Sequence, residues 1–229
     1  MPEEQSPPFL RLFLAIAVPP AVRQEIARAQ NRLRRDAPPG VLRWIRPDQF
    51  HVTVKFLGDV PSVQLEDLLQ SVSKVCREFP AMSLSARGID FFPDQRRPRV
   101  IWVPAGDPGG HLAALHQKMD AALRVFAASD SRRCFAGHIT LGRFKPGLRL
   151  VMDKVFGHIQ KLDGRHFGDW RAGELEIVRS TLTAGGASQR ILRLAGWLGE
   201  VSSSRRDCRA PFAFRFLVAW QVNACSHAP

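Results

Sequence analysis

The sequence predicts an α+β fold built from two similar halves. Short segments with alternating apolar residues, typical of half-buried strands, take turns with longer segments in which apolar residues recur every three or four positions, typical of helices. The tetrapeptide His-apolar-Thr-apolar occurs twice, at residues 51–54 and 138–141, once in each half. This alternation favours helices on the outside of a sheet and a cleft between two lobes.

The first half is expected to contain strands at about residues 11–18, 41–45 and 50–57 and helices at about 20–35 and 63–78. Pro19-Pro20 favours the start of the first helix, and Pro38-Pro39-Gly40 ends it. Apolar residues at helical spacing mark both helices: Val22, Ile26, Ala29 and Leu33, then Leu65, Leu68, Leu69, Val72 and Val75.

The second half is expected to contain strands at about residues 82–91, 100–103, 138–144, 174–183 and 190–197. Helices are expected at about residues 111–126 and 150–161. Pro146-Gly147 ends the strand of the second motif, and Gly185-Gly186 joins the last two strands.

The charge balance is strongly basic. The 229 residues include 33 Lys and Arg against 21 Asp and Glu, a net charge of +12. Such a charge attracts polyanions, of which nucleic acid is the commonest, although a basic protein without such a partner would carry it too. Arginine dominates the positive residues, and its planar guanidinium suits bidentate contacts with phosphate.

Cysteine spacing and the N-terminal segment argue against several protein classes. The chain has four cysteines: Cys76, Cys134, Cys208 and Cys225. They form no Cys-x-x-Cys pair and show no zinc-ligand spacing, so we expect neither a disulfide framework nor a metal site. Residues 9–18 are apolar, but they are too few for a membrane span and lack the basic start of a signal peptide. We therefore expect a cytoplasmic protein with no membrane partner.

The repeated motif points to chemistry at phosphorus. Successive side chains of a strand face opposite sides, so His51 shares a face with Thr53, and His138 shares one with Thr140. If the two strands are close, two imidazoles and two hydroxyls converge. One histidine could then take a proton while the other donates one, and the hydroxyls could hold the non-bridging oxygens. A single His-x-Thr is more often structural, so the duplication carries this interpretation.

The sequence around these motifs resembles the 2H phosphoesterase superfamily, and within it the RNA 2′,3′-cyclic phosphodiesterases, also called 2′-5′ RNA ligases. The similarity lies in residues 11–16, 44–45, 50–58, 98–103 and 112–116, and spans about residues 9–198. It implies two antiparallel-rich sheets with outer helices, related by a pseudo-twofold axis, whose motif strands face each other across a central cleft. One departure is Gly137, because the family more often has proline before the second histidine.

The resemblance implies metal-independent hydrolysis of RNA 2′,3′-cyclic phosphate ends to 2′-phosphomonoesters, without a cofactor. Water attacks phosphorus while one histidine takes its proton and the other protonates the departing 3′ oxygen. We assign His138 as the base and His51 as the acid, and the near-symmetry of the motifs leaves the reverse open. Thr53 and Thr140 would hold the equatorial oxygens. The expected partners are RNA ends or cyclic nucleotides, bound by a monomer.

Two cationic residues near the motifs are candidate phosphate ligands. Strict alternation places Lys55 on the face of His51 and Thr53, although a lysine in solvent at the strand end is equally consistent. The same alternation turns Arg143 away from the second motif. A bulge at Gly142 would return it to the cleft, and the resemblance implies an arginine there for binding phosphate.

Two further residues are weaker candidates for contacts with RNA. The resemblance implies that Phe13 lies near the nucleotide, although a core phenylalanine is the simpler expectation. Arg97 belongs to the basic loop 93–99, which could contact the RNA backbone or be a solvated loop.

Residues 9–200 are expected to form the 2H phosphoesterase domain, one motif in each lobe. Residues 201–229 depart from the family and are expected to be a loosely ordered C-terminal extension. Three alternative functions remain at this point. The chain could act on another cyclic or 2′-5′ phosphoester, including ligation, or bind RNA without catalysis. A metalloenzyme is least favoured, because ligand spacing is missing.

Overall fold

The computed structural model describes residues 8–94, 98–127, 135–145, 157, 159, 162, 164–183 and 186–197. In the first half the elements are β1 (Phe9–Ala17), α1 (Pro20–Asp36), β2 (Leu42–Trp44), the 3-10 turn η1 (Pro47–Gln49), β3 (His51–Pro61), the 3-10 turn η2 (Ser62–Gln64) and α2 (Leu65–Cys76). The second half contains β4 (Met82–Arg87), β5 (Asp90–Phe92), β6 (Val100–Gly106), α3 (His111–Ala122), β7 (His138–Phe144), β8 (His166–Ala172), β9 (Glu174–Thr183) and β10 (Gly186–Gly196).

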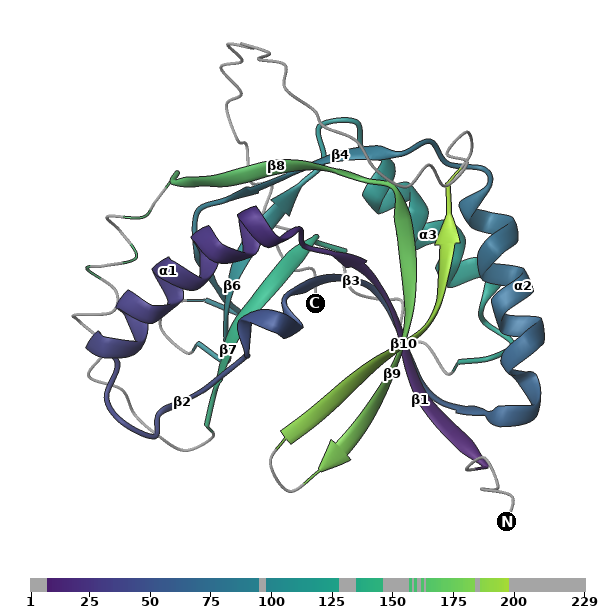
Figure 1. Ribbon diagram of the computed structural model, residues 1–229, viewed down its shortest axis with the longest axis horizontal. Helices are drawn as coiled ribbons and strands as arrows, with labels where there is room; N and C mark the ends of the chain where they lie inside the picture. Colours follow the sequence, from purple (N-terminus) through teal and green to yellow (C-terminus); the bar gives the residue numbers. More distant parts are fainter. Residues whose placement is uncertain are drawn as a thin grey trace, which may run out of the picture.

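The strands form one continuous, curved sheet in the order β10-β9-β1-β3-β7-β6-β4-β8, and β2 and β5 pair with β7 and β6 (Figure 1). The strand pairings that the structure describes are antiparallel. Helices and an antiparallel sheet confirm the predicted α+β class. The resemblance implied two sheets, whereas here the halves β10-β9-β1-β3 and β7-β6-β4-β8 are joined where the two motif strands meet, through the pair Val52 and Ile139.

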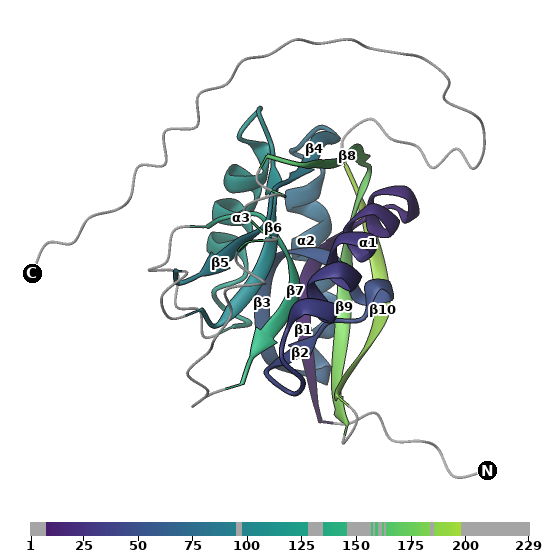
Figure 2. The same cartoon turned by 90° about the vertical axis from the view of Figure 1, so that its left-hand side faces the viewer.

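The helices cover the outside of this sheet. α2 and α3 lie side by side, with α3 against β3 and α2 against β10, while α1 packs against β8 (Figures 1 and 2). The predicted apolar face of α1 is buried, and so is most of that of α2. Residues three or four positions apart lie on the same side of a helix, so they are buried together. The buried residues of the two helices include Val22, Ile26, Ala29, Leu33, Leu68, Leu69, Val72 and Val75.

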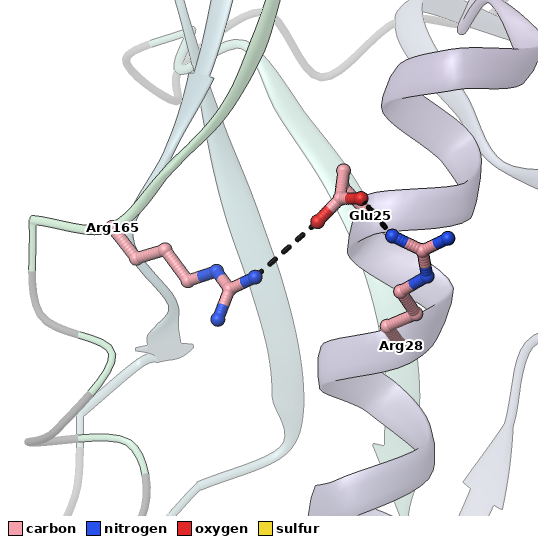
Figure 3. A network of polar contacts seen from close by, with 3 residues as sticks. All are labelled: Glu25, Arg28 and Arg165. Carbon is pink, nitrogen blue, oxygen red and sulfur yellow. Dashed lines mark hydrogen bonds and ion pairs between the residues drawn. The ribbon is translucent and has the colours of Figure 1, made fainter.

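A polar contact ties α1 to the segment that leads into β8. The carboxylate of Glu25 accepts a hydrogen bond from Arg28 on the same helix and another, at 3.3 Å, from Arg165 (Figure 3). The guanidinium of Arg165 also lies 5.6 Å from the centre of the Phe167 ring. These contacts supplement the burial of α1 against β8, although partly exposed ion pairs add little stability.

The main difference from the sequence-based expectation is β8, which periodicity did not predict. Phe167, Trp170 and Ala172 are buried, but the first two are three positions apart, which breaks the two-residue period. Gly168 has a positive φ of 143°, and the pairing with β4 shifts register next to it. The expected strand at 82–91 is two strands, β4 and β5, and α3 ends at Ala122 rather than at residue 126.

Several expectations fall outside the described residues or are not tested. Most of the helix expected at 150–161 and the whole of the extension at 201–229 lie outside the described part of the chain. The domain boundary near residue 200 therefore stays a prediction. In the described segments, no helix is both long enough and apolar enough to cross a membrane.

Candidate active site

The two motif strands lie next to each other. β3 and β7 are antiparallel and pair at Val52 and Ile139. In an antiparallel pair, the residues on either side of a paired residue face those on either side of its partner, so His51 lies across from Thr140 and Thr53 across from His138. Val52 and Ile139 are fully buried, while the four motif side chains on the opposite face are half-buried. The convergence that the duplicated motif required is therefore present.

Both histidine rings are oriented by the backbone in the same way. Nδ1 of His51 donates to the carbonyl of Gln49 at 2.8 Å, and Nδ1 of His138 donates to that of Ala136 at 2.9 Å. In each case the acceptor is two residues before the histidine. With Nδ1 protonated, Nε2 of a neutral ring is the free base. Nε2 of His51 accepts from the Thr53 hydroxyl at 3.0 Å.

An aromatic ring from a neighbouring strand packs against each histidine. The Phe13 ring of β1 lies 4.9 Å from that of His51, and the Trp102 ring of β6 lies 5.4 Å from that of His138, edge to face. Phe13 is buried, on the His51 face, in a small cluster separate from the main core. It is thus both buried and next to the candidate catalytic ring. The sequence analysis did not identify Trp102 as a residue of the site. Only its pairing with Thr140 in the sheet indicates that it lies there.

A β-bulge follows each motif. In β3, Thr53 pairs with Ala15 and Lys55 pairs with Leu14, which leaves Val54 as the extra residue. In β7, Thr140 and Gly142 pair with consecutive residues of β6, which leaves Leu141 extra. An extra residue reverses the alternation of side chains beyond it. Residues four positions after each histidine therefore turn to the core, and those five positions after it turn to the face of the motif histidines.

The bulge in β7 places Arg143 on the face of His138 and Thr140, as expected from Gly142. Its positive charge acts on His51 across the site. Arg143 is exposed and pairs with Arg43 of β2, so a second guanidinium emerges on the same face. Sequence reasoning missed Arg43, because nothing in its local pattern indicates that β2 lies beside β7.

The prediction that Lys55 shares the face of His51 is wrong. The bulge at Val54 turns Lys55 to the opposite side, where it is 5% exposed and its Nζ lies 2.5 Å from Oδ1 of Asp120 on α3. Phe56 takes the place that strict alternation gave to Lys55, and its ring is 64% exposed. Lys55 is therefore a buried structural cation and not a ligand for phosphate. Arg97 lies outside the described residues.

Side chains from the helices hold the carbonyl groups of both bulges. Nδ1 of His116 on α3 donates to the carbonyl of Val54 at 2.8 Å. On the other side, Nε2 of Gln30 on α1 donates to the carbonyl of Leu141 at 2.9 Å. The Leu141 carbonyl also accepts from the Ile45 N–H at 2.9 Å, so the two side-chain donors add to the contacts that hold the bulges in place. Sequence analysis did not identify either of these donors.

The environment of His51 favours its neutral form. Burial lowers the pKa of His51, and so do the positive charges of His138 and Arg143, while the hydrogen bond to Gln49 opposes them. Burial is the largest cause, because it removes water that would stabilise the imidazolium. A half-buried neutral imidazole with an unprotonated Nε2 is suited to accept a proton.

The described residues contain no group of three or more His, Cys, Asp and Glu side chains arranged to hold a metal ion. The candidate site instead consists of two imidazoles, two hydroxyls and a guanidinium. Such a set supplies two proton carriers together with donors for an anion.

Comparison with known proteins finds similar sequences and similar folds. Residues 16–102 match the family described as LigT-like phosphoesterases. The chain is 27% identical over 187 residues to the RNA 2′,3′-cyclic phosphodiesterase of Methanocaldococcus jannaschii, a match that covers 80% of this chain and 99% of that protein. It is 28% identical over 197 residues to the enzyme of the same name from Thermus thermophilus, covering 83% of this chain and 92% of that protein.

Solved structures of similar fold are also found. The crystal structure of TT0787 from Thermus thermophilus has a TM-score of 0.68 and 27% identity, and the match covers 84% of this chain and all of that chain. Escherichia coli LigT, solved in complex with 3′-AMP, has a TM-score of 0.65 and covers 84% of this chain and 99% of its own, and at 22% identity it shows the fold alone. The chain is thus similar to LigT-like phosphoesterases in sequence over residues 16–102, and similar in fold to TT0787 over most of its length.

Proposed function

We propose that this protein hydrolyses 2′,3′-cyclic phosphate ends of RNA to 2′-phosphomonoesters. The observation that carries the proposal is the adjacency of β3 and β7, which sets His51 across from Thr140 and Thr53 across from His138 on one face of the sheet. Relatives named RNA 2′,3′-cyclic phosphodiesterase that match about four fifths of the chain support the same reaction. A basic protein with a net charge of +12 would also attract RNA.

The two histidines differ in their surroundings, and this difference supports an assignment of roles. The pKa of His51 is lowered, chiefly by burial, so at neutral pH its Nε2 is available to take a proton from water. We therefore assign His51 as the general base and His138 as the general acid, the reverse of the preference from sequence. His138 would donate its proton to the 3′ oxygen as the ring opens.

The remaining polar groups would stabilise charge on the phosphoryl oxygens. Thr53 and Thr140 supply hydroxyl donors beside the two rings, and Arg143 supplies a guanidinium from the bulge. Donors that are fixed before the reaction stabilise the charge that develops in the transition state without reorganising. The scheme uses no metal, because both proton carriers and the anion donors come from this chain.

Turnover of cytidine 2′,3′-cyclic phosphate tests the proposal. Wild-type protein should release the 2′-phosphate in the presence of excess EDTA. Each of His51→Ala and His138→Ala should lose about 10²–10⁴-fold in turnover, the usual contribution of one proton carrier. His166→Ala is the matched control, because that histidine lies in β8 and contacts Asp169. Retained turnover in both motif variants, or binding of RNA without hydrolysis by the wild type, would contradict the proposal.

A second substrate separates the acid from the base. A 4-nitrophenyl phosphodiester has a leaving group that departs without protonation, so it needs a base but little help from an acid. His138→Ala should therefore lose much less activity on this substrate than on the cyclic phosphate, while His51→Ala should lose activity on both. The opposite pattern would restore the assignment of His138 as the base.

We further propose that the protein acts as a monomer in the cytoplasm. All the motif side chains come from one chain, and RNA ends are the proposed substrate. Sedimentation of the full chain at enzymatic concentration checks the oligomeric state, and a dimer whose dissociation abolishes turnover would contradict it.

A further inference from the structure

On the face that carries the motif residues, side chains of three neighbouring strands, β3, β1 and β9, form rows that cross the sheet. Ala15 of β1 pairs with Thr53 on one side and with Glu176 of β9 on the other. Side chains that are directly opposite share a face, so Thr53, Ala15 and Glu176 form one row. With strands about 4.8 Å apart, Glu176 lies about 10 Å from Thr53 along that row.

A small side chain leaves space next to this row. Ala15, between Thr53 and Glu176, is buried, whereas Ala17, which pairs with His51 in the next row, is exposed. Beside them is a pocket of about 280 Å³. Its lining includes His51 and Glu176 together with Arg23, Gln49, Gln189 and Ile191. Small-molecule pockets begin at roughly 300 Å³, so this space suits one ring system and not a large ligand.

A second row supplies an apolar surface next to the pocket. Phe13 pairs with Phe56 and with Val178, and Val178 pairs with Ile191 of β10. Phe56 and Ile191 are 64% and 51% exposed, which is unusual for side chains of this size on a sheet. Proteins that bind single-stranded RNA commonly stack bases on such apolar and aromatic surfaces.

Glu176 presents a carboxylate to this space. Burial and the neighbouring Glu174 raise the pKa of Glu176, and the Arg23 guanidinium opposes them. A carboxylate that has lost part of its hydration gains when a ligand offers N–H donors. It also repels phosphate, so the pocket does not suit a second phosphoryl group.

We propose that this pocket binds the base of the terminal nucleotide and that Glu176 selects bases that carry an exocyclic amino group. The inference rests on the proposed function, because the phosphorus must sit between His51 and His138 for the base to reach Glu176. The carboxylate accepts from the N4 amino group of cytosine. Uracil presents a carbonyl oxygen at the same position, which the carboxylate repels.

Binding of 2′-CMP and 2′-UMP, measured by calorimetry on the full chain, tests the proposal without turnover. The two ligands share ribose and phosphate and differ only in the edge of the base. Wild-type protein should bind 2′-CMP about tenfold more tightly than 2′-UMP, the size of discrimination expected for one good contact with a base. Glu176→Gln should bring the ratio of the two dissociation constants close to one, with affinity for 2′-UMP kept.

Glu174→Gln is the matched control, because it removes the same charge from an exposed position of the same strand. It leaves the Glu176 carboxylate in place and removes a charge that raises the pKa of Glu176, so the preference for 2′-CMP should persist. A wild-type ratio near one, a ratio that persists in Glu176→Gln, or absence of binding by both nucleotides would overturn the inference. If the ratio behaves as expected but cyclic phosphates are not hydrolysed, the proposed function fails and the base pocket stands. If cyclic phosphates are hydrolysed but Glu176→Gln does not change the ratio of dissociation constants, the base pocket fails and the proposed function stands.

Discussion

The side-chain amide of Gln30 donates a hydrogen bond to the carbonyl of Leu141 at 2.9 Å, across 111 residues of sequence. The same amide donates to the carbonyl of Ile45 at 2.8 Å, and Gln30 is 3% exposed. Leu141 is the bulged residue of β7, and Arg143 follows it by two positions. A helix on the outside of the sheet thus helps to fix the bulge that places the Arg143 guanidinium on the face of His138.

Replacement of Gln30 should weaken both stability and catalysis. Gln30→Leu removes one donor from each of two carbonyls, of which that of Leu141 keeps the Ile45 N–H, and the loss should cost about 1–3 kcal/mol of unfolding free energy. Because the bulge then loses a constraint, the turnover of fully folded protein should also fall. Urea unfolding and turnover at a temperature well below the transition measure the two effects. Gln24→Leu, on the exposed side of the same helix, should change neither, and equal behaviour of the two variants would contradict this role.

The buried ion pair beneath the other bulge should be costly to break. Asp120→Asn leaves the Lys55 ammonium buried without its carboxylate, which should cost about 3–5 kcal/mol. Lys118 lies on α3, like Asp120, and forms an exposed ion pair with Glu78. Glu78→Gln breaks that pair and should cost about 0–1 kcal/mol. The double variant Lys55→Met/Asp120→Leu should recover much of the loss, because no buried charge remains. Chemical denaturation compares the three, and a similar cost for Asp120→Asn and Glu78→Gln would show that the buried pair is not structural.

The acid limb of the pH–rate profile should report on His51. Because burial lowers the pKa of His51 in the folded protein, the limb of kcat/KM should lie below the value of about 6.5 for a free histidine. The Arg143 guanidinium contributes to the lowering, so Arg143→Met should move the limb to higher pH as well as reduce the rate. Arg190→Met, at an exposed position of β10, should leave the limb unchanged. An acid limb that stays in place or moves down in Arg143→Met would contradict the assignment of His51 as the base.

The glycine before the second histidine should resist substitution. A Cβ at Gly137 would lie 2.7 Å from the backbone oxygen of Ala105, whose N–H donates to the Gly137 carbonyl at 2.9 Å. Gly137→Ala must therefore move the backbone next to His138, with a cost of roughly 1–3 kcal/mol and a loss of turnover. Proline, which the family more often has there, carries the same Cβ. Gly106→Ala places its Cβ 3.8 Å from the nearest atom and is the control. Thermal unfolding that leaves both variants equal to the wild type would show that the strand can shift freely.

Local sequence patterns predicted most of the helices and strands, because the side of an element that is buried repeats with the period of its backbone. The helical spacing of Val22, Ile26 and Leu33 reflects one buried face, and β7 spans residues 138–144, as the sequence around the second motif predicted. Where the period was irregular, as in β8 at Gly168, the prediction failed. The family resemblance, carried by the two His-apolar-Thr-apolar segments, was confirmed by the comparisons.

The sequence by itself determined that the two histidine–threonine pairs would each lie on one face of a strand, because alternation is a local property of extended backbone. Only the tertiary structure decided that Lys55 faces the core, that Arg143 shares the face of His138, and that Glu176 lies in the same row as Thr53. These positions depend on bulges and on registers between strands far apart in sequence, such as the pairing of Ala15 with Glu176, 161 residues away. A single extra residue in a ladder reverses every side chain beyond it, and the partner strand and the covering helix set where that residue falls.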